Sequence, residues 1–122
     1  MKQCTLQLIR KMYDLYNRKY FGSKLPKDVG FYWASHCRHL TKPGQKFFKT
    51  NIYGLTVITQ NADQSISTDI IFNDVFKKHL VFLGLTLLHE MLHVQLKGGT
   101  HGPKFKKARK RLMRLGAFDE WL

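Results

Sequence analysis

The strongest constraint on the fold is a helical stretch, residues 74–96, that is apolar around most of its circumference. Asp74 is a suitable N-cap residue, and Gly98 and Gly99 supply a stop signal. The longest apolar run within it, residues 80–88, is about half as long as a membrane-spanning helix. Because a helix without a polar face is stable only when covered, we expect this one to form the buried centre of the fold.

Other segments predict a small α+β arrangement around this helix. Three segments rich in β-branched and aromatic residues, 29–35, 52–59 and 66–72, predict strands, and residues 61–64 predict a hairpin turn. We expect these strands to form a three-stranded antiparallel sheet. Apolar residues at steps of three and four predict an amphipathic helix over about the first twenty residues, followed by stop signals; they are Leu6, Ile9, Met12, Tyr13, Tyr16 and Tyr20, and the stop signals are Gly22 and Pro26.

A further amphipathic helix is predicted near the C-terminus. Pro103 suits a first helical position, and Gly116 marks the end. A narrow apolar stripe is expected to dock this helix along one edge of the fold; it consists of Phe105, Ala108, Leu112 and Leu115. With 122 residues, we expect one α+β domain covering residues 1–122.

The buried helix contains an HExxH pattern, formed by His89, Glu90 and His93. Positions i and i+4 share one face of a helix, so two imidazoles can bind one Zn²⁺ at about 2.0–2.1 Å. Glu90 is offset by one position and lies beside the metal, where a general base takes a proton from zinc-bound water. An unpaired carboxylate on the most apolar helix is costly without a functional partner. The pattern predicts a catalytic zinc site, and satisfied core histidines are the alternative.

A third zinc ligand is needed, since catalytic zinc usually has three protein ligands and one open position. His101 is the first candidate, because the two glycines after the helix let the chain turn back toward the metal. A downstream acid, Asp119 or Glu120, is the alternative. We expect His101.

The charge balance points to a polyanionic partner, since 21 Lys and Arg against 8 Asp and Glu leave a net charge of +13. The last predicted helix carries seven cations and no acid: Lys104, Lys106, Lys107, Arg109, Lys110, Arg111 and Arg114. A predicted loop mixes cations with aromatic residues, which suits a nucleic-acid strand whose bases stack on rings: Arg38, Lys46, Phe47, Phe48 and Lys49. The alternatives are a solvated helix face and an apolar anchor for the loop.

The string HEMLHVQLKGGTHGPKFKKA resembles the signature of SprT-like metalloprotease domains, the family of bacterial SprT and eukaryotic Spartan proteases. The segments LYNRKYFGSKLP and FYWAS are similar to the opening segment of that family, so the resemblance covers most of the chain. It implies a zincin-like, minigluzincin-type fold, with His89, His93 and His101 as zinc ligands and Glu90 as the acid/base. It also implies an endopeptidase that cleaves proteins bound or crosslinked to DNA, with DNA promoting cleavage. Because no zinc ribbon follows the motif, we expect a minimal version of the domain, of a size that suits a phage or mobile element.

Two other functions fit the same residues. One is a nucleic-acid-binding module with a structural zinc, and the other is a phage or plasmid accessory protein that cleaves nothing. The presence of only Cys4 and Cys37 excludes a disulfide framework and a four-cysteine zinc ribbon. We therefore expect an intracellular, cytoplasmic protein (in the host cytoplasm if it is phage-encoded), monomeric and not bound to membranes.

Overall fold

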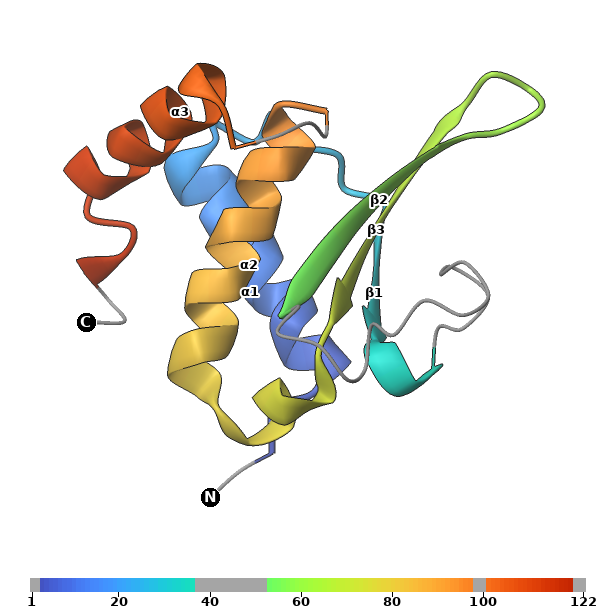
Figure 1. The fold of residues 1–122 in the computed structure, drawn as a ribbon, viewed down its shortest axis with the longest axis horizontal. Helices are drawn as coiled ribbons and strands as arrows, with labels where there is room; N and C mark the ends of the chain where they lie inside the picture. Colours follow the sequence, from blue (N-terminus) through green and yellow to red (C-terminus); the bar gives the residue numbers. More distant parts are fainter. Residues whose placement is uncertain (1–2, 37–52, 98–100, 120–122) are drawn as a thin grey trace.

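The computed structural model describes residues 3–36, 53–97 and 101–119. In these ranges the chain forms three α-helices, two short 3-10 helices and a three-stranded mixed sheet (Figure 1), which confirms the predicted α+β class. The order of elements is α1 (Leu6–Tyr20), β1 (Val29–Trp33), η1 (Ala34–His36), β2 (Gly54–Gln60), β3 (Ile66–Phe72), η4 (Asp74–Lys78), α2 (Leu80–Gln95) and α3 (Pro103–Arg114).

The sheet has the strand order β1-β3-β2. β2 and β3 form the predicted antiparallel hairpin, and the amide of Asn61 donates to the carbonyl of Ser65 (2.8 Å) in its turn. β1 pairs in parallel with β3, with Val29 opposite Thr68. The prediction of an all-antiparallel sheet is therefore wrong: successive strands alternate in direction, but the neighbour of β1 is β3 and not β2.

β3 occupies the centre of the sheet because it is apolar on both faces. Ile70, Ile71 and Phe72 are consecutive, and each is 0% exposed. Consecutive side chains of a strand point to opposite faces, so only a strand that is covered on both sides buries all three. β2 is only partly buried along most of its length and lies at an edge.

The helices cover one face of the sheet. α1 and α2 lie side by side against it, α1 next to β1 and α2 next to β2 (Figure 1). Most of α2 is buried in this core, as predicted for the central helix, and five of its core residues are 0% exposed: Leu83, Leu87, Leu88, Met91 and Leu92. Its first three residues, Leu80, Val81 and Phe82, are exposed, which the prediction of a covered helix did not anticipate. A smaller apolar cluster on the other face contains Ile71 and Ala34. No helix in the described ranges is long and apolar enough to span a membrane.

The segment before α2 departs from the single helix predicted over 74–96. It forms the separate helix η4, and α2 begins only after a break at His79. The amide of Cys4 donates to the carbonyl of Lys77 (2.7 Å). This bond takes the acceptor that a continuous α-helix would offer to the amide of Val81. The N-terminal segment that contains Cys4 therefore competes with a continuous helix for the carbonyl of Lys77.

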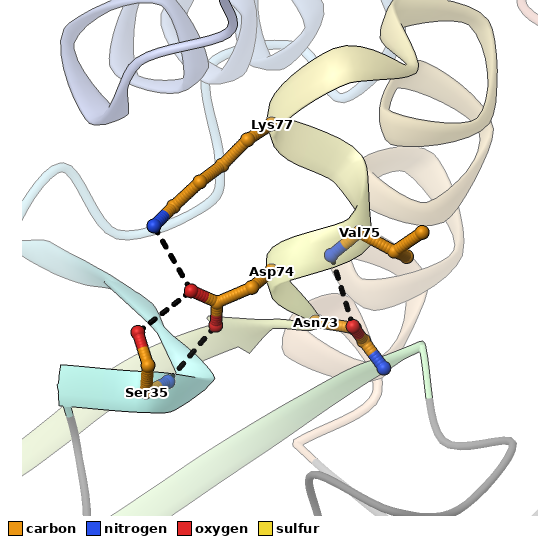
Figure 2. Close-up of polar contacts among 5 residues, drawn as sticks. All are labelled: Ser35, Asn73, Asp74, Val75 and Lys77. Carbon is orange, nitrogen blue, oxygen red and sulfur yellow. Dashed lines mark hydrogen bonds and ion pairs between the residues drawn. The ribbon is translucent and has the colours of Figure 1, made fainter.

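The cap of η4 also differs from the prediction (Figure 2). Asn73 is the N-cap, and its Oδ1 atom accepts from the amide of Val75 (3.0 Å). Asp74 instead accepts hydrogen bonds from the amide (2.9 Å) and the hydroxyl (2.6 Å) of Ser35, and it pairs with Lys77 (2.9 Å). Asp74 thus joins η1, which follows β1, to the segment before α2.

The C-terminal part of the chain largely follows the prediction. α2 ends at Gln95 and is followed by Lys97 at a left-handed φ of 57°, while Gly98 and Gly99 lie outside the described residues. α3 begins at Pro103 and ends before Gly116, as predicted. Of its predicted apolar stripe, Phe105 and Leu112 are buried and Ala108 is partly buried, but Leu115 is 49% exposed because it lies beyond the last helical turn.

Candidate metal centre

Three histidine side chains converge where α2 meets the start of α3. His89 and His93 lie one turn apart on α2, and His101 lies just before α3. The Nε2 atom of His101 is 3.0 Å from that of His89 and 3.1 Å from that of His93. Among the described residues, this group alone has the side-chain geometry to hold a metal ion.

The geometry and the charge state of this group fit a zinc ion. Tetrahedral ligands at about 2.0–2.1 Å from zinc lie about 3.3 Å from one another, close to the separations seen here. Burial, aided by the positive charges of His93, His101 and Arg109, lowers the pKa of His89 to about 4. Burial and His101 also lower the pKa of His93. These two imidazoles are therefore neutral at pH 7 and offer lone pairs to a cation.

The alternative third ligands are not part of this group. Asp119 is described and does not belong to it, and Glu120 lies outside the described residues. The structure therefore places His101, and not Asp119, beside His89 and His93.

Glu90 lies next to the three histidines and is held by the edge strand. It is 4% exposed, and its Oε1 atom accepts a hydrogen bond from the hydroxyl of Thr56 on β2 (2.7 Å). Burial raises the pKa of Glu90 to about 7, and the hydrogen bond from Thr56 partly offsets this rise. A cation bound by the histidines would favour the carboxylate form. With a cation bound, the carboxyl group would thus be ionised and able to accept a proton.

Phe105 forms the wall behind the three imidazoles. It is 2% exposed, and its ring centroid lies 4.8–5.0 Å from the centroids of His89, His93 and His101. Because Phe105 is on α3, this contact fixes the basic helix against the histidine cluster. The imidazoles consequently have apolar support on the side away from the sheet.

A small hollow opens between β2 and α2 at this cluster. Its volume is about 240 Å³, and it is lined by Gly54, Leu55, Thr56, His89, Glu90, His93 and His101. A Cβ atom at Gly54 would lie 3.2 Å from both Cγ and Oε2 of Glu90 and 2.9 Å from Cγ2 of Thr86. Glycine at position 54 therefore lets the edge strand approach α2 closely enough for Thr56 to reach Glu90.

A family model matches residues 9–119, and it is that of the SprT-like family. The chain belongs to the SprT-like family. The resemblance seen in the sequence is thus confirmed, and membership suggests a metallopeptidase-like domain. No curated protein and no solved structure gives a significant match to this SprT-like chain.

The predicted nucleic-acid contacts of this SprT-like domain fall into two sets. All seven cations of α3 are exposed, and in the described ranges none of them forms an ion pair. Arg111 also donates to the carbonyl of Tyr20 (2.7 Å), so it fastens α3 to the end of α1. The second set, Arg38, Lys46, Phe47, Phe48 and Lys49, lies outside the described residues.

Two residues at the site carry no signal in the sequence. Thr56 is one of several threonines in strands, and Gly54 is one of nine glycines in the chain. Their importance comes from the distance between β2 and α2, which no local pattern encodes. Phe105, by contrast, was predicted to be a buried residue of the apolar stripe, but its contact with the histidines was not predicted.

Proposed function

We propose that this SprT-like domain is a zinc-dependent endopeptidase in which His89, His93 and His101 hold the metal and Glu90 is the general base. The observation that supports the proposal is the convergence of three Nε2 atoms beside a buried carboxyl group. The three ligands leave one position open, which favours a catalytic over a closed structural zinc. We also propose that the fold is zincin-like.

The chemistry follows from the groups around the hollow. A zinc ion bound there supplies a Lewis acid that polarises the scissile carbonyl and makes water more acidic. Glu90 accepts the proton of the attacking water and passes it to the nitrogen of the leaving amine. Thr56 holds one oxygen of Glu90, so the other oxygen is the one that is free to take the proton.

The decisive experiment compares the wild-type protein with Glu90→Gln. We expect both proteins to bind one zinc ion, measured by elemental analysis, and only the wild-type to cleave β-casein, with and without single-stranded DNA. The amide cannot accept a proton, so turnover falls by at least about a hundredfold. Full activity of Glu90→Gln would remove this mechanism. Binding of DNA by both proteins, with cleavage by neither, would favour a binding module with a structural zinc.

The assignment of the third ligand is tested by His101→Ala, with Asp119→Asn as the matched control. We expect His101→Ala to lose zinc during dialysis, because two imidazoles alone bind it weakly, and Asp119→Asn to retain it. Unchanged zinc stoichiometry in His101→Ala would transfer the role of third ligand to an acid.

The proposed substrates are proteins bound or crosslinked to DNA. Support comes from α3, whose exposed cations follow the histidine cluster directly and are attached to it through Phe105. Such a helix would bind the phosphate backbone without reading base sequence. A protease held on DNA in this way would meet proteins that are already bound there.

A further inference from the structure

A second, larger hollow lies beside the candidate metal centre. Its volume is about 350 Å³, and its lining is largely apolar: Tyr53, Val75, Phe76, His79, Phe82, Leu85 and Thr86. Neither the HExxH chemistry nor the basic helix uses any of these residues. The hollow is bounded by the residue before β2, by η4 and by the first half of α2.

The two hollows share a wall. Tyr53 lines the apolar hollow and the next residue, Gly54, lines the metal centre. On α2, Thr86 lines the apolar hollow and comes one turn before Glu90. A Cβ atom at Gly54 would touch both Thr86 and Glu90, at 2.9 and 3.2 Å, so the strand and the helix nearly meet between the two hollows. A chain lying across this contact would reach both.

Several apolar residues that line the hollow are exposed to solvent. Phe82 is 61% exposed, Tyr53 is 56% exposed and Val75 is 48% exposed. The ring of Tyr53 packs on that of Phe76 at 5.8 Å, and the ring of His79 lies 6.4 Å from that of Phe82. Covering apolar surface with an apolar ligand is favourable, because it removes that surface from water. The volume is sufficient for one large aliphatic or aromatic side chain.

The edge strand offers a way to bring such a side chain there. β2 lies at the edge of the described sheet, and the carbonyl of Tyr53 accepts from Asn73, so it faces β3. Backbone groups alternate along a strand, so those of Gly54 and Thr56 face away from β3. An extended peptide can pair with such an edge while its side chains enter neighbouring pockets.

The spacing along α2 sets the position of the side chain. Thr86 and Phe82 precede His89 by three and seven residues, or about 4.5 and 10.5 Å along the helix axis. An extended peptide advances about 3.3 Å per residue. The side chain in the apolar hollow would thus belong to a residue within about three positions of the cleaved bond.

We propose that the apolar hollow is a substrate pocket that selects cleavage sites carrying a large aliphatic or aromatic side chain close to the scissile bond. This inference rests on the proposed endopeptidase function, because it assigns the pocket to the same substrate chain. The supporting observation is the close approach of Gly54 and Thr86, which places the pocket directly beside the metal centre.

The first arm of the test maps the bonds cleaved in β-casein by the zinc-loaded wild-type protein, using mass spectrometry. We expect one fixed position near the cleaved bond to be enriched in Leu, Phe, Met and Tyr. Two peptides that differ only by Leu or Ala at that position should then differ about tenfold in kcat/KM, as is typical of apolar pockets. No enrichment at any position would overturn the proposal.

The second arm uses Val75→Trp, which fills the hollow, and Val81→Trp as the matched control. Val75 and Val81 are similarly exposed, at 48% and 45%, but only Val75 lines the hollow. We expect Val75→Trp to reduce the preference for Leu over Ala to within about twofold, and Val81→Trp to keep it at about tenfold. Phe82→Ala, which removes one wall, should also reduce it. Equal preferences in all four proteins would overturn the proposal.

Failure of the pocket can be told apart from failure of the proposed function. Cleavage by the wild-type protein without an apolar preference would support the endopeptidase function and overturn the proposed substrate pocket. If it cleaves nothing, the function fails, and the methyl NMR signals of Val75 and Leu85 are titrated with N-acetyl-leucinamide and N-acetyl-alaninamide. Shifts with the leucine compound alone would support the pocket, and equal or absent shifts would overturn it. A wild-type dimer that Val75→Trp converts to a monomer would also overturn it, since a second copy would then cover the hollow.

Discussion

At the scale of single residues, the site depends on the contact between Gly54, Thr56 and Glu90. The missing side chain of Gly54 allows β2 to approach α2, and Thr56 then donates to the buried carboxyl group at 2.7 Å. Without this donor, Glu90 would lose its hydrogen-bond partner among the described side chains. Buried polar groups without partners are costly and poorly oriented.

Thr56→Val should therefore slow cleavage without removing the metal. Hydrogen bonds to charged groups contribute about 1.5–3 kcal/mol, so we expect kcat to fall about tenfold or more while KM stays within about twofold. Thr56→Ser restores the hydroxyl and should restore most of kcat. Both variants should retain the zinc content of the wild-type protein. An unchanged kcat in Thr56→Val would show that Glu90 is oriented by other contacts.

At the scale of elements, the short helix η4 decides where α2 begins. Its Asp74 is tied to η1, just after β1, by Ser35 and to its own helix by Lys77 (Figure 2). Burial alone would raise the pKa of Asp74, but the Ser35 hydroxyl, Lys77 and the Ser35 amide together lower it below its ordinary value of 3.8. The folded state therefore favours the ionised carboxylate.

Ser35→Ala should destabilise the fold in a pH-dependent manner. A carboxyl group with a lowered pKa stabilises the folded state above its unfolded value, and this contribution is lost as the pH falls through the folded value. We expect Ser35→Ala to be about 1 kcal/mol less stable than wild-type at pH 7, from urea unfolding, since the contact is partly exposed. The difference should shrink as the pH falls below the ordinary value of 3.8. A constant difference between pH 7 and pH 2.5 would contradict this account.

At the scale of the whole molecule, seven of the 21 Lys and Arg residues lie on one helix, α3, which packs against the histidine cluster through Phe105. α3 turns Phe105 toward the imidazoles and leaves its cations exposed. Arg111 is partly occupied by the carbonyl of Tyr20, so the other six are freer to bind an anion. Like charges one turn apart repel each other, and phosphates would relieve this repulsion.

The proposed binding of DNA predicts a salt dependence. Replacing Lys106, Lys107 and Lys110 together with Gln should weaken binding to a single-stranded oligonucleotide and reduce the slope of log K against log salt by about 2. The matched control makes the same change in charge elsewhere, at Lys11, Lys27 and Lys78, and should leave most of the affinity and slope intact. Fluorescence anisotropy at several salt concentrations measures both quantities. Equal losses in the two triple variants would indicate a general effect of net charge.

Much of the local structure could be predicted from the sequence. The extents of α1 and α3 follow from periodic apolar residues and from glycine and proline at or near their ends, and that of β3 from β-branched and aromatic residues after a turn. The strand order could not be predicted, because alternation along a strand is the same whichever neighbour it pairs with. The break before α2 was also missed, because it depends on the amide of Cys4, which is remote in sequence from Lys77.

The chemistry proposed for the chain follows from a short local stretch of its sequence. His89 and His93 share a face because the geometry of a single helix places i and i+4 together, and the family signature follows from the same local string. The packing of distant segments, in contrast, brings His101 to these two histidines, lets Thr56 hold Glu90 and places an apolar hollow beside the site. These contacts join segments that approach one another because the core between sheet and helices is packed, and no local spacing encodes that distance.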